Sequence, residues 1–239
     1  MKIRAIVVDI YRTVLEVGPP PADAAARWDA LWRELLGASP RIGLPEFGAR
    51  CEQVVAREHS RARECGVTHP EIYWPDVVTE VVPELGEREP AVRAEFMFRQ
   101  TGCWHTVRAM PGVGVALRRA RERGCRLGIA SNAQPYTLRE LAEALETEGL
   151  TPEIFEPALC FWSFDHGFSK PDPHVFRVLA ARLRALGVAV GETLMVGDRL
   201  DNDIAPARAQ GWQTWHWRAE PGEGGGDWAA LESRLTTSA

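Results

Sequence analysis

Lysine is almost missing from this sequence. Among 239 residues only Lys2 and Lys170 are lysines, so arginine supplies nearly all of the positive charge. Lysine and arginine together number 28 against 33 aspartates and glutamates, which gives a formal net charge of −5. A chain with this balance offers no basic surface for holding a nucleic-acid backbone, and we expect no nucleic-acid partner.

Long hydrophobic runs and closely spaced cysteines are missing too. The only early apolar run, residues 3–8, is short and is followed by Asp9 and Arg12, so neither a signal peptide nor a membrane span is predicted. The five cysteines form no CxxC pair and have no zinc-type spacing. Reduced thiols in a cytoplasmic protein without a membrane partner are therefore expected.

Short apolar segments alternate with helical patterns in most of the chain. Strands are expected at 3–8, 125–130, 158–163, 192–196 and 213–217. Helices are expected between them, at 113–123, 138–148, 173–186 and 203–210, and again from residue 227. This alternation is typical of a parallel sheet with right-handed crossovers, so we predict an α/β fold with a Rossmann-like, doubly wound core.

The segment after the first strand has a different character. Residues 18–21, Gly-Pro-Pro-Pro, predict a linker. Apolar residues then recur at helical spacing around Trp28 and Trp32, and further helical stretches follow at 44–66, 74–85 and 90–101. We expect an all-helical cap domain at 17–105, inserted into a core domain made of residues 1–16 and 106–239.

Polar side chains follow several of the predicted core strands. Because ligands bind beyond the carboxyl ends of the strands in open α/β sheets, these side chains are expected to share one site. Taken singly, each is better explained as a helix cap or turn residue, or, for Lys170, as a solvated surface charge. Their order favours an active site with a nucleophile, an oxyanion binder, a fixed cation and a carboxylate pair suited to a metal. In chain order they are Asp9, Ser131, Asn132, Lys170, Asp198 and Asp203.

This ordered set resembles the motifs of the haloacid dehalogenase-like hydrolase superfamily. The family's DxDxT, Ser/Thr-Asn, Lys and GDxxxxD motifs correspond here to 9–13, 131–132, 170 and 197–203. The helical insert matches the family's cap domain in position and length. The resemblance implies a hydrolase that acts on a small anionic metabolite, as a monomer or homodimer.

The resemblance also implies a role for each position. Asp9 would attack the substrate and form an aspartyl ester or aspartyl phosphate. The Ser131 hydroxyl and the Asn132 backbone would bind the oxygens of the transferring group, and Lys170 would neutralise their charge. The cofactor would be Mg²⁺, held by Asp9, Asp198 and the main-chain carbonyl of Tyr11, with support from Asp203.

Two positions depart from the family's phosphatases. These enzymes have Asp two residues after the nucleophile, where it protonates the leaving alcohol and then activates water; here that position is Tyr11, and a phenol is a poor base at neutral pH. Arg12 replaces a small glycine and is a candidate to bind the substrate. Tyr11 resembles the metal-free 2-haloacid dehalogenases of the same superfamily, whereas Asp198 and Asp203 resemble the Mg²⁺ phosphatases.

Three functions therefore remain open from the sequence. The first is Mg²⁺-dependent hydrolysis of a small phosphorylated metabolite, with Tyr11 as a modified catalytic group. The second is dehalogenation of a 2-haloacid. The third is a catalytically weak binding or regulatory protein built on the same scaffold.

Overall fold

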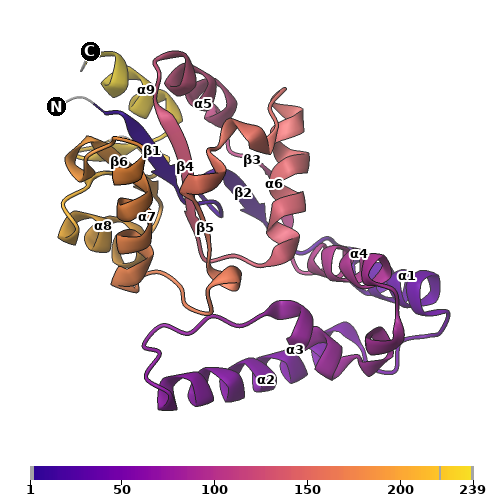
Figure 1. Ribbon diagram of the computed structural model, residues 1–239. Coiled ribbons are helices and arrows are strands. Elements are labelled where there is room, and N and C mark those ends of the chain that lie inside the picture. The colour runs from indigo at the N-terminus through magenta and orange to yellow at the C-terminus, as the bar shows by residue number, and fades with distance from the viewer. Residues whose placement is uncertain (1–2, 221, 238–239) are drawn as a thin grey trace.

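The computed structural model describes residues 3–220 and 222–237. Its core is a parallel sheet of six strands in the order β5-β4-β1-β6-β7-β8 (Figure 1). The strands are β1 (Ala5–Val8), β4 (Arg126–Ser131), β5 (Cys160–Trp162), β6 (Thr193–Gly197), β7 (Gln213–Trp217) and β8 (Gly225–Gly226). The predicted α/β class is confirmed. The order reverses at β1, which pairs with β4 on one side and β6 on the other, so the topological switch point lies between β1 and β6.

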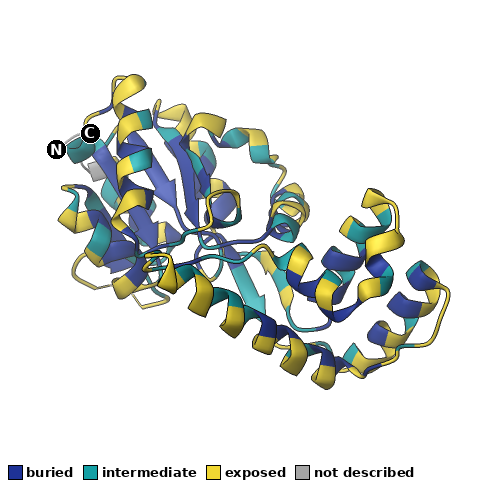
Figure 2. Cartoon of the chain, turned by 60° about the horizontal axis from the view of Figure 1, so that its bottom comes forward, coloured by how far each residue is buried: buried dark blue, intermediate teal, exposed yellow. Residues whose placement is uncertain are grey.

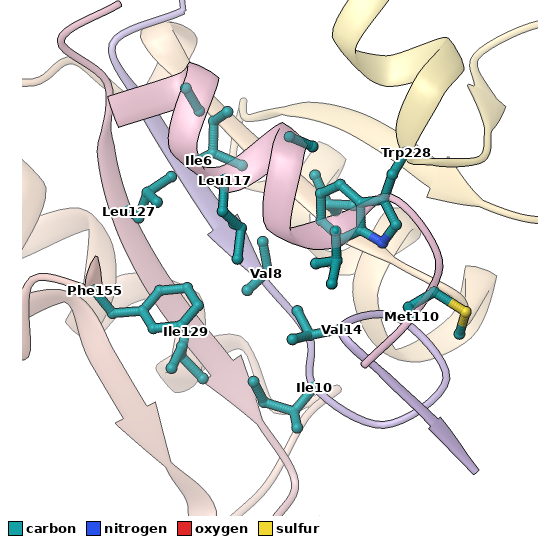
Figure 3. Close-up of a cluster of buried hydrophobic side chains, with 14 of the residues drawn as sticks. Ile6, Val8, Ile10, Val14, Met110, Leu117, Leu127, Ile129, Phe155 and Trp228 are labelled. Atoms are coloured by element: carbon teal, nitrogen blue, oxygen red, sulfur yellow. The ribbon is translucent and has the colours of Figure 1, made fainter. Parts of the chain in front are cut away.

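Helices cover both faces of the sheet because the central strand is apolar on both. Ile6 and Val8 of β1 pack with residues of α5 (Val113–Glu122), α6 (Pro135–Thr147) and α9 (Trp228–Thr237). Figure 3 shows part of this cluster, with Leu117 of α5 lying over the strand and Trp228 of α9 beside it. The alternate residues Ala5 and Val7 pack on the other face with α7 (Pro173–Ala185) and α8 (Ala205–Ala209).

Four helices between the first strand and the rest of the core form a separate lobe, which we call the helical lobe. They are α1 (Ala24–Leu36), α2 (Leu44–Glu64), α3 (Trp74–Val81) and α4 (Pro90–Thr101), as the helical spacing predicts. The lobe has its own apolar interior, in which the Trp28 ring lies 4.7 Å from that of Phe47 and 5.9 Å from that of Phe96, between ring centroids. Its helices are buried on one side and exposed on the other (Figure 2).

A two-stranded antiparallel sheet that was not predicted joins the lobe to the core. Strand β2 (Leu15–Gly18) pairs with β3 (Thr106–Ala109), so the two crossings of the chain run side by side. Each strand has only four residues and its partner is about ninety positions away, which leaves no local pattern to recognise. Strand β8 was not among the predicted strands either. Helix α8 is shorter than the predicted 203–210 because a π-helical turn (Leu200–Ile204) precedes it.

A second connection fastens the lobe to the core between residues 69 and 74, a segment we call the strap. Its backbone pairs with the core: Glu71 donates its N–H to the carbonyl of Gly167 at 3.0 Å, and Ser169 donates to the carbonyl of His69 at 2.9 Å. The Glu71 carboxylate accepts from the Ser163 hydroxyl at 2.6 Å and from the Gln134 amide at 3.0 Å. The strap therefore lies against the loop that carries Lys170, with His69 bonded to the neighbouring Ser169.

No helix within these described residues has the length and apolar character needed to cross a membrane.

The Ser163 contact gives a stability prediction. Ser163 is fully buried, and its hydroxyl also accepts from the Ala133 N–H. Replacing Ser163 by Ala leaves the part-buried Glu71 carboxylate and the buried Ala133 N–H each short of one partner, so the unfolding free energy should fall by about 1–3 kcal/mol. Ser60→Ala, which removes an exposed contact to Glu64, is the control and should change it by less than about 0.5 kcal/mol. Equal effects in urea unfolding would contradict the role assigned to the strap.

Candidate active site

A buried ammonium lies between two carboxylates from distant parts of the chain. The Lys170 Nζ donates to Asp9 Oδ1 at 2.7 Å and to Asp203 Oδ1 at 2.6 Å. Asp9 follows β1 directly, and Asp203 belongs to the π-helical turn after β6. Because β1 and β6 are parallel neighbours, their carboxyl ends deliver both acids to the same edge of the sheet.

The Asn132 side chain fixes the loop that carries the ammonium. Its amide nitrogen donates to the Lys170 carbonyl at 2.8 Å, and its carbonyl oxygen accepts from the Lys170 N–H at 2.8 Å. This pair of bonds holds the backbone of Lys170 from the end of β4. The sequence analysis expected only the backbone of Asn132 to act; the structure adds this positioning contact.

Hydrogen bonds to the backbone hold the acidic segment 198–203 in place. Asp203 Oδ2 accepts from the Arg199 N–H at 3.0 Å, and the His216 ring lies 2.9 Å from the carbonyl oxygen of Asp198. A Cβ atom at Gly197 would collide with the Asp203 carboxylate. Glycine at 197 is therefore what allows Asp203 to lie directly against the end of β6.

These residues line a cavity of about 230 Å³, which we call the carboxylate cavity. Its walls come from the loops after β1, β4 and β6 and from the loop before α7. The lining residues are Asp9, Tyr11, Arg12, Asn132, Lys170, Asp198, Arg199, Asn202 and Asp203.

The donor set of this cavity fits a divalent cation. One carboxylate oxygen from each of Asp9, Asp198 and Asp203 can be chosen so that all three lie within 4.8 Å of one another. Lys170 is buried among these three acids, whereas Arg12 and Arg199 are exposed. Carboxylates completed by water are the ligands that Mg²⁺ prefers, so the excess of buried negative charge suits this ion.

Burial shifts the pKa values of the acids in this cavity. Burial raises the pKa of Asp9 to about 6, with Lys170 opposing the shift and Asp203 adding to it. Burial and the neighbouring Asp203 also raise the pKa of Asp198. Burial alone would lower the pKa of Lys170, but the Asp9 and Asp203 carboxylates outweigh it and the pKa is raised. Lys170 is therefore a fixed positive charge, and a bound cation would lower the pKa of the acids around it.

The Tyr11 phenol is directed at a carboxylate of the core. Its hydroxyl donates to Glu140 Oε2 at 2.5 Å and lies 2.8 Å from the Thr137 hydroxyl, both on α6. The other oxygen of Glu140 lies 2.9 Å from the His105 ring nitrogen. Burial and the Glu140 charge raise the pKa of Tyr11 above its ordinary value. The phenol therefore keeps its proton and donates it in a hydrogen bond to Glu140.

Arg12 has an unusual backbone conformation. Its φ is 61°, in the left-handed region that costs an L-residue with a side chain about 1–2 kcal/mol. The residue is exposed and lines the carboxylate cavity. A glycine would adopt this turn without strain, so the arginine side chain is present here at a cost to stability.

Ser131 is placed differently from the other residues that the sequence singled out. It ends β4 with 1% of its surface exposed and does not line the carboxylate cavity. Its hydroxyl has no hydrogen-bond partner among the residues that the structure describes. Its part in binding substrate stays a prediction.

Sequence reasoning missed the groups around Tyr11. Glu140 is one acid among several on the amphipathic helix α6, and His105 lies in the turn between α4 and β3. Neither belongs to a recognisable motif. The only signal was indirect: a tyrosine in place of an aspartate needs a polar partner for its hydroxyl when it is buried.

Comparison with known proteins supports the family that the motifs indicate. A family model described as haloacid dehalogenase-like hydrolase matches residues 3–211. The glyceraldehyde 3-phosphate phosphatase of Pyrococcus abyssi is 37% identical over 108 residues, which cover 45% of this chain and 42% of that relative. The phosphoserine phosphatase of Thermus thermophilus is 34% identical over 137 residues, which cover 56% of this chain and 50% of that relative. The chain thus spans about half the length of these curated relatives.

Solved structures agree on the fold. The 2-haloacid dehalogenase of Pseudomonas syringae pv. Tomato DC3000 superposes with a TM-score of 0.60 at 19% identity, covering 99% of this chain and 100% of that one. At this identity the likeness concerns the fold alone. The match over residues 3–211 carries the family assignment: this chain belongs to the haloacid dehalogenase-like hydrolases.

Proposed function

We propose that this chain hydrolyses a phosphate monoester of a small molecule, with Asp9 as nucleophile and Mg²⁺ as cofactor. The observation that carries the proposal is the carboxylate cavity, where Asp9, Asp198 and Asp203 converge around Lys170. Two curated relatives that are named as phosphatases point to the same substrate class. We further propose that the helical lobe serves as the cap over this site.

In this proposal the side chains divide the work. Asp9 attacks the phosphorus atom, the bond to the ester oxygen breaks, and an aspartyl phosphate forms. Lys170 neutralises charge on the nucleophile and on the phosphoryl oxygens. Asp198 and Asp203 would hold Mg²⁺ together with Asp9, and the ion supplies positive charge next to the transferring group when it is bound. Water then attacks the aspartyl phosphate and releases inorganic phosphate.

Tyr11 favours a second candidate, dehalogenation of a 2-haloacid. A halide leaves without a proton, so this reaction needs no acid two residues after the nucleophile. The acids argue for the phosphatase: in a reaction without a metal ion, a substrate carboxylate would meet Asp9, Asp203 and the part-buried Asp198 around a single buried lysine. The third possibility, a binding protein with little activity, is what remains if both reactions are absent.

A substrate screen tests the proposal. Hydrolysis of phosphate monoesters should require Mg²⁺, stop when EDTA is added and return with excess Mg²⁺. Asp9→Asn should lower kcat by about a thousandfold or more, since the amide cannot form the covalent intermediate. Asp29→Asn, on the exposed side of α1, is the matched control and should keep full activity.

Halide release from 2-haloacids in the presence of EDTA, without phosphatase activity, would instead establish the second candidate. Full activity of Asp9→Asn on any substrate would remove Asp9 from the proposed role.

Arg12 gives a separate prediction. Arg12→Gly relieves the strained turn but adds backbone freedom to the unfolded chain, so the unfolding free energy should change by less than about 1 kcal/mol. If the guanidinium contacts the phosphate, KM should rise about tenfold or more while kcat changes little. Arg12→Lys keeps the charge, and its KM should lie between those of the wild type and Arg12→Gly. An unchanged KM in Arg12→Gly would show that the side chain does not bind substrate.

A further inference from the structure

The helical lobe contains a second cavity, close to but separate from the carboxylate cavity. We call it the lobe cavity; its volume is about 640 Å³, and α2, α3, α4 and the first turn of α6 enclose it. Phe47, Val55, Trp74, Trp104 and Tyr136 supply most of its apolar wall. A cavity of this size and composition is typical of a small-molecule site.

Polar atoms without partners lie among these aromatic side chains. Gln100 is 1% exposed, and its side-chain oxygen has no hydrogen-bond partner among the described residues. The same holds for the indole N–H of Trp74 and for Nε2 of His59, and all three side chains line the lobe cavity. These three atoms have almost no surface exposed to the cavity, so they lie behind its wall and the wall itself is largely aromatic and apolar.

The two cavities meet at a pair of aromatic rings. Tyr11 lines the carboxylate cavity, and His105 lines the lobe cavity. Their rings make an edge-to-face contact with 6.1 Å between centroids, and both side chains bond to the Glu140 carboxylate. A molecule with its phosphate at Asp9 and its organic part in the lobe cavity would have to pass along these two rings.

Tyr11 also restricts which leaving group can depart. Its hydroxyl proton is directed at Glu140, so no acid stands two residues after the nucleophile to protonate the leaving oxygen. An aliphatic alcohol is a far weaker acid than a phenol, so it departs poorly without such help. A phenol has a pKa of about 10 and departs far more readily as the anion.

We propose that the substrate is a phosphate monoester of an aromatic hydroxyl compound, whose ring system occupies the lobe cavity. This inference rests on the proposed phosphatase function and names its substrate class. As an Asp9 oxygen bonds to phosphorus, the bond from phosphorus to the ring oxygen breaks. The phenolate leaves with that electron pair and takes a proton from water. A second water releases phosphate and restores Asp9.

Two alanines on the same helix allow a matched test. Ala56 is exposed and lines the lobe cavity, whereas Ala49 is exposed on α2 but lies outside it. Ala56→Trp and Ala49→Trp add the same side chain to the same helix, and only the first should obstruct the cavity. Two substrates, 1-naphthyl phosphate and glycerol phosphate, differ in whether they carry a ring. Two others, phenyl phosphate and benzyl phosphate, both carry a ring, but the first releases a phenol and the second an aliphatic alcohol.

The wild type should favour 1-naphthyl over glycerol phosphate and phenyl over benzyl phosphate, each by about tenfold or more in kcat/KM. Ala56→Trp should raise KM for 1-naphthyl phosphate about tenfold and leave KM for glycerol phosphate unchanged. Ala49→Trp should change neither.

Equal use of 1-naphthyl and glycerol phosphate, or equal KM values in the two variants, would overturn the inference while the phosphatase function stands. If no phosphate ester is hydrolysed at all, the proposed function fails. Binding of 1-naphthol, followed by ligand-detected NMR, then tests the lobe cavity directly. Binding that is lost only in Ala56→Trp supports the ring site, and binding that is absent or equal in all three proteins overturns it.

Discussion

The structure is organised around one buried ion cluster, in which the Lys170 ammonium lies between Asp9 and Asp203. Lys170 is 161 residues from Asp9 and 33 from Asp203 in the chain, so the contact ties the beginning of the core to its last third. Removing one member of a buried ion pair generally costs about 3–5 kcal/mol, because it leaves a charge without compensation. The loops after β1 and β6 and the loop before α7 are thus ordered by the same three charges.

The parallel sheet brings the groups of this cluster together. The cluster carries a net negative charge, which the proposed reaction explains. Strand β1 lies between β4 and β6, so their carboxyl ends place Asn132, Asp9 and Asp198 at one edge. A fold selected for stability alone would match each buried acid with a base. Here Asp198 is a third acid beside one buried lysine. Burial, with a smaller contribution from Asp203, raises the pKa values of Asp9 and Asp198. In the proposed function, this is where a cation and a phosphoryl group would bind and offset the uncompensated negative charge.

The sequence predicted the core well, because its signals are local. Apolar runs of five or six residues mark buried strands, and the polar residues that end them mark the active edge. The β2–β3 strand pair and the strap could not be predicted, since each depends on pairing between segments far apart in the chain. The partners of Tyr11 were missed for the same reason. Glu140 is distinguished from other helical acids only by its hydrogen bond from the Tyr11 hydroxyl, which the folded chain brings to it. The lobe cavity likewise arises from the packing of separate helices, which periodicity alone cannot place.

The central claim is that Asp9 accepts a phosphoryl group in a cavity completed by Mg²⁺, and a phosphoryl mimic tests it without any knowledge of the substrate. Beryllofluoride with Mg²⁺ should raise the Tm of the wild type by several degrees, because a ligand that binds only the folded state stabilises it. Asp9→Asn should show no rise, and neither should the wild type with beryllofluoride and EDTA. Equal protection of the wild type and Asp9→Asn would contradict the account.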